Sequence, residues 1–330
     1  MSSYLAGLDD QSLAGLLQRS GAEEEGFGGR TSQLTVGKAK VFCKLVPLTI
    51  LEAQPENHKS TANIFQLPSY YQYGIGSVGF GAWRELAAHA LASDWVVSGK
   101  QEQFPLMHHW RVVKLPSVAS VESEAEEYLT HAAAHGNDES AIRERLRSLR
   151  ASTSHIAIFS EHFPETLSEW LVEQLQSDAL SASAAIWFTE EKAREVLEFM
   201  RSRNFVHFDA HLGNILTDGN RLYFADFGLA MHDSFDLTHD ERSFLTSHTG
   251  YDRARFASSM VHTICRAMPG KEAWSEKLSN LNLHAKSLPP AAIAALQRYA
   301  VAAKYIGQFA QALINTNRHA KFAPPPEALL

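Results

Sequence analysis

Histidine and aspartate residues alternate in the stretch VHFDAHLGNIL, which runs from Val206 to Leu216. His207, Asp209 and His211 occupy every second position, and such positions face the same side of an extended strand. Two imidazoles and a carboxylate on one face could bind zinc or non-haem iron. The same residues would also fit a turn at the end of a strand, with its polar groups hydrogen-bonded. Taken alone, the stretch leaves both interpretations open.

A second carboxylate downstream adds a third interpretation. The segment ILTDGNRLYFAD reads as two short strands joined by a turn at 218–220. A hairpin brings its two ends together, so Asp209 and Asn214 before it should lie close to Asp226 after it. Two carboxylates and an amide provide hard oxygen ligands for Mg²⁺ and leave one spare carboxylate. The spacing therefore predicts a magnesium site as the third interpretation.

The bulk properties of the chain limit the class of protein. Its 330 residues exceed the size at which a single core stops growing, roughly 250–300 residues, and predict one large domain or two lobes. The net charge of −7 disfavours nonspecific binding to nucleic acid. Two cysteines, Cys43 and Cys265, are too few for a disulfide scaffold. The N-terminus does not resemble a signal peptide, and no run of about 18 apolar residues suggests a membrane span, so we expect a cytoplasmic protein.

Secondary-structure patterns divide the chain near residue 163. We expect a helical extension over 1–20, then a strand-rich domain over 21–162 that contains insertions at 53–82 and 118–150. The first insertion is rich in Gly, Pro, Ser, Asn and Tyr, and the second is charged and helix-prone. Residues 163–330 show mostly helical spacing, except for short strands around the hairpin. The predicted fold is α+β, with a small antiparallel sheet followed by a helical region.

This order of motifs resembles the protein-kinase-like phosphotransferases. Their catalytic loop reads His-x-Asp followed by Asn five positions after the Asp, and the corresponding residues here are 207–209 and Asn214. Their metal motif, Asp-Phe-Gly, appears at 226–228, and its first residue lies twelve positions after Asn214. The resemblance implies a bilobal fold, with ATP and Mg²⁺ as cofactors.

The resemblance also implies a lysine on the third strand and a glutamate on the following helix. Lys44, in the strand-like run VFCKLV, is the candidate for contact with the α- and β-phosphates of ATP. Glu85 is the candidate for the helix glutamate that holds this lysine, although the two lie 41 residues apart. Glu52 is an alternative partner, and the 53–82 insertion would explain the long separation.

Two further parts of the nucleotide site are expected from the family pattern. A glycine-rich turn before Lys44 contains Gly26, Gly28 and Gly29, whose spacing departs from G-x-G-x-x-G. Backbone N–H groups in such a turn can approach phosphates closely, although a plain surface turn would look the same. The segment from Glu161 to Phe163 resembles the hinge between the lobes and would offer backbone groups to adenine.

Each residue of the catalytic segment has an implied role. Asp209 would accept the proton of the acceptor hydroxyl, while Asn214 and Asp226 would hold Mg²⁺. His207 would support the loop through backbone hydrogen bonds rather than act chemically. Asp252, at the start of a later helix, would either support the same backbone or cap its own helix.

The acceptor is not fixed by these motifs. Protein serine/threonine kinases carry Lys two positions after the catalytic Asp, where this chain has His211. The run DAHLGN resembles the D-x-H-x-G-N of aminoglycoside and other small-molecule phosphotransferases, and the Ala-Pro-Glu motif is absent. The run ADFGLA is closer to protein kinases. We expect ATP and a hydroxyl acceptor as partners, with a protein acceptor slightly favoured over a small molecule, and a noncatalytic ATP-binding scaffold as the third alternative.

Overall fold

The computed structural model describes residues 1–19, 24–26, 29–75, 77–115, 139–284, 288–324 and 326, without the side chains of 18, 19, 24–26, 283 and 284. The chain forms two compact units. Unit 1 contains Met1–His162 and Phe227–Phe244, and unit 2 contains Phe163–Asp226 and Leu245–Leu330. The fold is mixed α and β, with a small antiparallel sheet and a helical region, as the sequence predicts.

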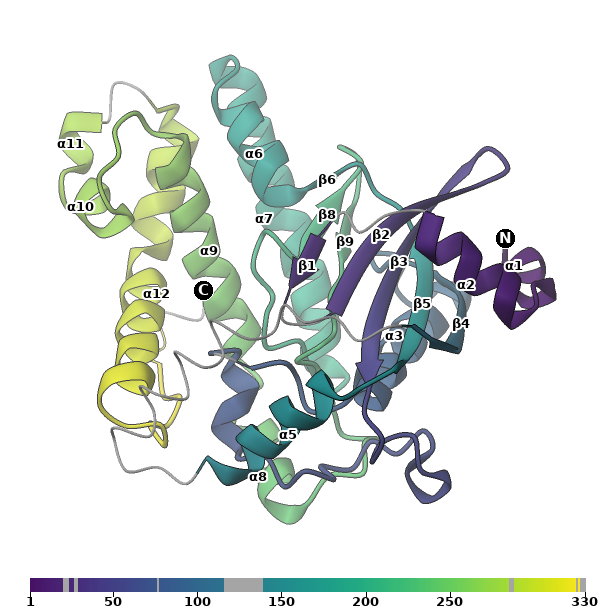
Figure 1. The fold of residues 1–330 in the computed structure, drawn as a ribbon. Helices are drawn as coiled ribbons and strands as arrows, with labels where there is room; N and C mark the ends of the chain where they lie inside the picture. The colour runs from purple at the N-terminus through teal and green to yellow at the C-terminus, as the bar shows by residue number, and fades with distance from the viewer. Residues whose placement is uncertain are drawn as a thin grey trace. The chain divides into compact units, whose positions relative to one another are not determined.

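Unit 1 is built around a five-stranded antiparallel sheet with the strand order β1-β2-β3-β5-β4 (Figure 1). A tight turn at Gly37 joins β2 to β3, where the alternating pattern of the sequence predicts a hairpin. The strands are β1 (Glu24–Gly26), β2 (Gly29–Val36), β3 (Ala39–Leu48), β4 (Met107–Lys114) and β5 (Ser154–Glu161). The other elements of the unit are α1 (Ser2–Gly7), α2 (Asp10–Arg19), η1 (Pro55–Asn57), η2 (Ser69–Tyr73), α3 (Ala82–Val97), α5 (Ser140–Arg150), β10 (Met231–His232) and most of α8 (His239–Ser247).

The two faces of this sheet bury different helices. Side chains alternate between faces along β3, so Val41, Cys43 and Leu45 contact the N-terminal helices, whereas Val46 and Leu48 contact α3. Lys44 lies in phase with Val46 and therefore faces α3. The period of two in the sequence thus decides which helix can reach this lysine.

The N-terminal helices form part of the core of unit 1. Leu5, Leu13 and Leu17 are buried in one cluster with apolar residues of β2, β3, β4 and β5. Arg111 of β4 donates to the carbonyl oxygens of Leu5 and Leu8 at the end of α1, at 3.3 and 2.6 Å. Within the described residues 1–19, helices α1 and α2 cover one face of the sheet.

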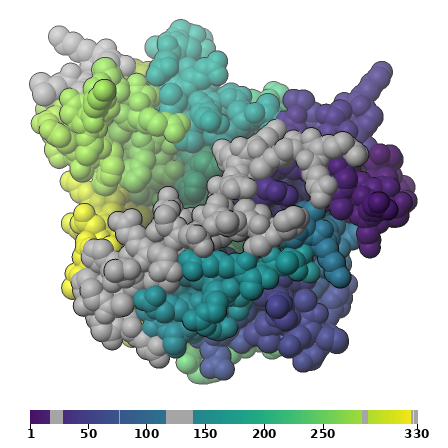
Figure 2. Space-filling model, viewed as in Figure 1, coloured from purple at the N-terminus to yellow at the C-terminus, as the bar shows by residue number. Residues whose placement is uncertain are grey.

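Residues 49–75 and 77–81, which include most of the expected insertion 53–82, have no regular secondary structure apart from η1 and η2, yet many of their side chains are buried. Tyr70, Tyr71 and Tyr73 of η2 are buried. The second expected insertion, 118–150, is described only from residue 139, and its described part forms the amphipathic helix α5. Figure 2 shows α5, in teal, on the viewed surface of unit 1.

Unit 2 is mostly helical and contains a small antiparallel sheet of order β6-β8-β9. Helix α9 packs against α6 and α12. The elements are β6 (Glu165–Thr166), α6 (Leu167–Leu175), α7 (Ala179–Ser202), β7 (Phe205–Val206), β8 (Ile215–Thr217), β9 (Leu222–Phe224), α9 (Tyr251–Ala267), α10 (Trp274–Ser279), α11 (Leu281–His284) and α12 (Pro290–Asn315). Within the described ranges, no helix combines the length and the apolar character that a membrane span requires.

The segment Phe227–Phe244 groups with unit 1, although the sequence suggests one helical domain for all residues after 162. Its contacts explain the difference. Phe227 packs edge-on against His89 of α3, with ring centroids 4.8 Å apart, and Arg84 of α3 forms a 2.7 Å ion pair with Glu241. Polar and aromatic contacts with α3 therefore hold this segment, and such contacts between distant residues are not visible in hydrophobic periodicity.

Candidate functional site

Lys44 and Glu85, predicted as partners from the order of motifs, are in contact. The Lys44 Nζ and Glu85 Oε1 atoms lie 2.7 Å apart, and their side chains are only 6% and 5% exposed. The alternative partner, Glu52, pairs with Arg145 instead. A buried ammonium needs a close carboxylate to offset the loss of hydration, so this pair fixes the position of the Lys44 head group.

Packing and helix geometry bring Glu85 to Lys44. Trp83 and Leu86 lie in the cluster that joins α3 to β3 and β5, and this contact orients the first turn of the helix. Glu85 lies in that turn, where the positive end of the helix dipole favours a carboxylate. One turn later, the His89 Nε2 atom lies 4.0 Å from Glu85 Oε1.

The glycine-rich turn ends beside the strand that carries Lys44. Gly26 and Gly29 pair across β1 and β2, whereas Gly28 lies outside the described residues. Gly29 has a φ of +126°, and a Cβ atom there would lie 2.2 Å from the carbonyl oxygen of Leu45. Only glycine fits this backbone conformation and this close approach. The fold itself therefore requires glycine at position 29, whether or not a ligand binds.

The two residues predicted for the hinge lie in different units. Glu161 ends β5 in unit 1, where its amide donates to the carbonyl of Leu106 and its carboxylate accepts from the Leu106 amide, both at 3.0 Å. Phe163 belongs to unit 2, where its ring stacks on Tyr223 at a centroid distance of 3.7 Å. The amide of Glu161 is thus already used within unit 1.

In unit 2, Asp252 holds the backbone of the predicted catalytic loop. Its carboxylate accepts hydrogen bonds from the amides of His207 at 2.7 Å and Phe208 at 2.8 Å. Phe208 has a φ of +64°, an unfavourable conformation for a bulky side chain, and is buried against Tyr251. Burial raises the pKa of Asp252 to about 6. Of the two roles considered for Asp252, the contacts match support of the loop.

His207 is buried and its two ring nitrogens contact backbone groups. Nε2 lies 2.9 Å from the carbonyl oxygen of Ala225, and Nδ1 accepts from the amide of Asp209 at 3.3 Å. Both nitrogens are therefore occupied, which opposes the zinc or iron interpretation of the alternating histidines. In the part of the chain that the structure describes, no group of three or more His, Cys, Asp or Glu side chains could hold a metal ion.

Asp209 accepts hydrogen bonds from two side chains and remains partly accessible. Asn214 donates to its Oδ2 atom at 2.9 Å, and Arg255 donates to Oδ1 at 3.2 Å. The Nε2 atom of His211 lies 3.6 Å from Oδ2, and the carboxylate side chain is 31% exposed. Burial would raise the pKa of Asp209, but the contact with the His211 ring and the charge of Arg255 hold the pKa below its ordinary value of 3.8.

The β8–β9 hairpin brings Asn214 and Asp226 to the same end of the small sheet. Ile215 pairs with Phe224, and the amide of Ala225 donates to the carbonyl of Asn214 at 2.9 Å. The side-chain nitrogen of Asn214 donates to Asp209, so its Oδ1 atom is the one suited to a metal ion. Mg²⁺ requires few protein ligands when phosphates and water complete its shell, so an amide and a carboxylate oxygen fit it.

Two polar residues near the predicted catalytic loop were missed in the sequence. Arg255 contacts Asp209, and the hydroxyl of Ser259 accepts from the amide of Leu212 at 3.0 Å. Together with Asp252 they occupy positions i, i+3 and i+7 of α9, which lie on one face of a helix. A polar stripe of this spacing on an otherwise buried helix is the signal that could have identified them.

No protein-family model matches the chain, and a search of curated proteins finds no similar sequence. Function is therefore inferred from the residues and contacts described above.

Proposed function

We propose that this chain is an ATP-dependent phosphotransferase that moves the γ-phosphoryl group of ATP to a hydroxyl acceptor. The proposal includes the bilobal protein-kinase-like arrangement, Mg²⁺ as the accompanying metal, and a cytoplasmic location. It rests on two groups of residues, the Lys44–Glu85 pair of unit 1 and the residues Asp209, Asn214 and Asp226 of unit 2.

One observation carries the proposal. Asn214 donates to Asp209 through its side chain, and its backbone carbonyl accepts from Ala225, the residue before Asp226. A partly exposed carboxylate, an amide oxygen and a second carboxylate thus converge at one end of a hairpin. Phosphoryl transfer requires mainly alignment and neutralisation of phosphate charge, and these three groups meet that need.

In the proposed mechanism, each residue positions a reacting group. Lys44 orients the α- and β-phosphates, and Glu85 holds Lys44 in place. Asn214 and Asp226 would hold Mg²⁺, which when bound would neutralise charge on the phosphates. Asp209 accepts a hydrogen bond from the acceptor hydroxyl. A bond forms between that oxygen and the γ-phosphorus as the bond to ADP breaks, and the proton passes late to Asp209, whose low pKa makes it a weak base.

The acceptor is proposed to be a protein serine or threonine hydroxyl. A small-molecule hydroxyl is the second candidate, and one observation favours it. The His211 ring lies beside Asp209 and accepts from the amide of Gly213 at 3.0 Å, and a Cβ atom on Gly213 would lie 2.9 Å from that ring. His211 and Gly213 therefore pack against each other, and they lie in the part of the loop that differs from the protein-kinase pattern.

The proposal is tested by following ADP release from ATP and Mg²⁺ while peptide and metabolite pools are supplied as separate acceptors. We expect release to depend on Mg²⁺ and on one of the two pools, and Asp209→Asn should slow it by roughly 10²–10⁴-fold. Asp218→Asn is the matched control, because Asp218 lies in the turn at the opposite end of the same hairpin. If Asp209→Asn and Asp226→Asn leave ADP release unchanged, the assignment is wrong. Nucleotide-dependent thermal stabilisation without turnover would indicate the noncatalytic scaffold.

A further inference from the structure

The N-terminus of α3 is capped by a residue from outside the helix. Its N-cap residue, Gly81, has no side chain to accept from the first free amides. The Oε1 atom of Glu52 accepts from the amide of Ala82 at 2.7 Å. A Cβ atom on Gly81 would lie 3.1 Å from that same oxygen, tighter than nine in ten Cβ contacts, so glycine makes room for the carboxylate.

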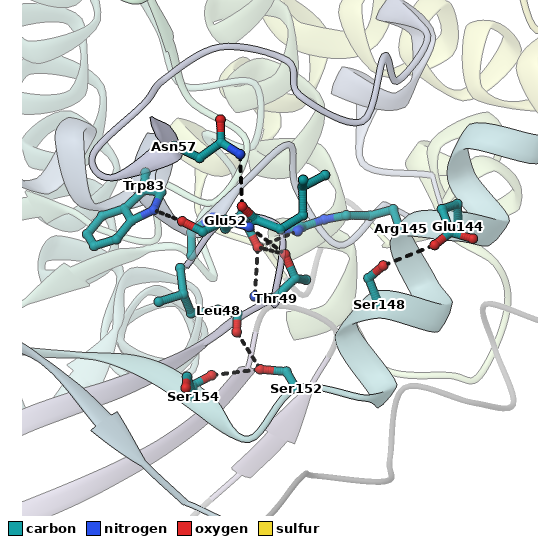
Figure 3. A network of polar contacts seen from close by, with 12 residues as sticks. Leu48, Thr49, Glu52, Asn57, Trp83, Glu144, Arg145, Ser148, Ser152 and Ser154 are labelled. Carbon is teal, nitrogen blue, oxygen red and sulfur yellow. Dashed lines mark hydrogen bonds and ion pairs between the residues drawn. The ribbon is translucent and has the colours of Figure 1, made fainter. Parts of the chain in front are cut away.

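Figure 3 shows that Glu52 lies at the centre of a polar network. Its Oε2 atom accepts from the amide and hydroxyl of Thr49 at 2.9 and 2.7 Å, and from Arg145 at 2.7 Å. The backbone carbonyl of Glu52 accepts from the indole nitrogen of Trp83 at 2.8 Å. The side chains of Glu52 and Arg145 are each 2% exposed. The network therefore joins the segment after β3, the helix α5 and the first turn of α3.

The charge of Arg145 is what makes this cap possible. A carboxylate buried without a cation would lose its hydration with no compensation, and it would become protonated or leave the site. Arg145 provides that cation from α5, and its guanidinium lies over the ring of Phe65, 4.9 Å from the centroid. Both partners are thus held by further contacts, which gives the carboxylate a fixed position at the helix end.

We propose that Glu52 and Arg145 form a positioning clamp on the first turn of α3. Glu85 follows Ala82 by three residues in the same turn, so an anchored amide at Ala82 also fixes where the Glu85 carboxylate points. The clamp keeps Glu85 against Lys44. Its consequence for ATP binding rests on the proposed function, whereas its effect on the ion pair does not.

The test measures the exposure of Lys44 directly. The full-length protein is treated with a small amine-reactive reagent, and modification of Lys44 is followed by peptide mass spectrometry. We expect Arg145→Met to label roughly tenfold faster than the wild type, because local opening exposes a buried group. Arg145→Lys, which keeps the charge, should label nearly as slowly as the wild type.

Two control variants separate the clamp from general effects on α5 and on stability. Arg147→Ala removes an exposed arginine from the same helix, whose side chain is 73% exposed. Leu13→Ala weakens the core on the opposite face of the sheet without touching α3. Both controls should label Lys44 at close to the wild-type rate. If Arg145→Met does not fold, Glu52→Asp takes its place, since it keeps the charge but draws the carboxylate back from Ala82.

Two readouts keep the clamp distinct from the proposed function. Faster Lys44 labelling in Arg145→Met or Glu52→Asp than in Leu13→Ala supports the clamp, and equal labelling overturns it. Where the wild type binds ATP and Mg²⁺, the clamp variants should raise the KM for ATP with less effect on kcat, while Arg147→Ala changes neither. A wild type that binds no nucleotide refutes the proposed function, and the labelling result still decides the clamp.

Discussion

Replacing Asp252 with Asn should change the pH dependence of stability in a defined direction. The carboxylate is buried, and it accepts the amides of His207 and Phe208. Burial raises the pKa of Asp252 from its ordinary value of 3.8 to about 6. The folded protein therefore binds a proton at this site over a pH range in which the unfolded chain has already released it.

The magnitude follows from this difference in pKa. The stabilisation from Asp252 is fully present below pH 3.8 and is lost as the pH rises to about 6. The pKa difference corresponds to about 3 kcal/mol, at about 1.4 kcal/mol for each pH unit. Asn cannot titrate, so Asp252→Asn should gain stability relative to the wild type as the pH rises. Any cost of the altered hydrogen bonds is present at both ends of this range and cancels in the comparison.

The assay is urea unfolding of both proteins, followed by tryptophan fluorescence. Between about pH 4.5 and about pH 8, the unfolding free energy of Asp252→Asn should rise by about 2 kcal/mol relative to the wild type. A difference between the two proteins that stays constant with pH, or that moves toward the wild type as the pH rises, would refute the reasoning. Such a result would mean that the backbone amides stabilise the ionised carboxylate more than burial destabilises it.

Three further predictions concern residues of unit 1. Glu85→Gln should lower the unfolding free energy by about 1–3 kcal/mol and weaken ATP binding, because a neutral amide replaces the carboxylate that contacts the buried Lys44 ammonium; urea unfolding and ATP titration measure the two effects. The unfolding free energy of Glu139→Gln should rise by about 1–3 kcal/mol relative to the wild type as the pH rises, because burial raises the pKa of Glu139 from 4.5 to about 7 and disfavours the ionised form. Thermal unfolding at both ends of that pH range tests this. Gly29→Ala should destabilise unit 1 by about 1–3 kcal/mol, because its Cβ would meet the Leu45 carbonyl; the shift in Tm measures it.

Each of these predictions has an outcome that would contradict it. A Glu85→Gln variant with wild-type stability would mean that the ion pair is open in solution. If the stability of Glu139→Gln relative to the wild type does not rise with pH, the Glu139 carboxylate is exposed to water. Gly37→Ala is the matched control for Gly29→Ala, since both glycines have positive φ but a Cβ at Gly37 meets open space. Equal losses in the two variants would show that backbone strain alone, and no contact with Leu45, explains the effect.

The sequence predicted the elements around the site well where local pattern was sufficient. The alternation along VFCKLV indicated a strand, and the same alternation places Lys44 on the side of α3. The turn at 218–220 indicated the hairpin that brings Asn214 close to Asp226. In both cases the side-chain positions follow from the period of the element, without knowledge of the tertiary fold.

The remaining features depend on contacts between distant residues. The choice between Glu52 and Glu85 required the packing of α3 on the sheet, because both residues follow Lys44 along the chain. Arg255 reaches Asp209 from a helix that begins far downstream. The apolar positions of the N-terminal helix were visible, but the face of the sheet that they cover was not. Long-range partners of this kind leave no periodic signal.

The central proposal is phosphoryl transfer with Asp209 as the proton acceptor. The most direct measurement follows transfer of labelled γ-phosphate in a single turnover, with ATP affinity determined on the same samples. We expect the wild type to transfer label to an acceptor, and Asp209→Asn to bind ATP comparably but transfer roughly 10²–10⁴-fold more slowly, while Asp218→Asn behaves as the wild type. Transfer at the wild-type rate by Asp209→Asn, or no transfer by a wild type that binds ATP and Mg²⁺ with every acceptor pool, would contradict this account.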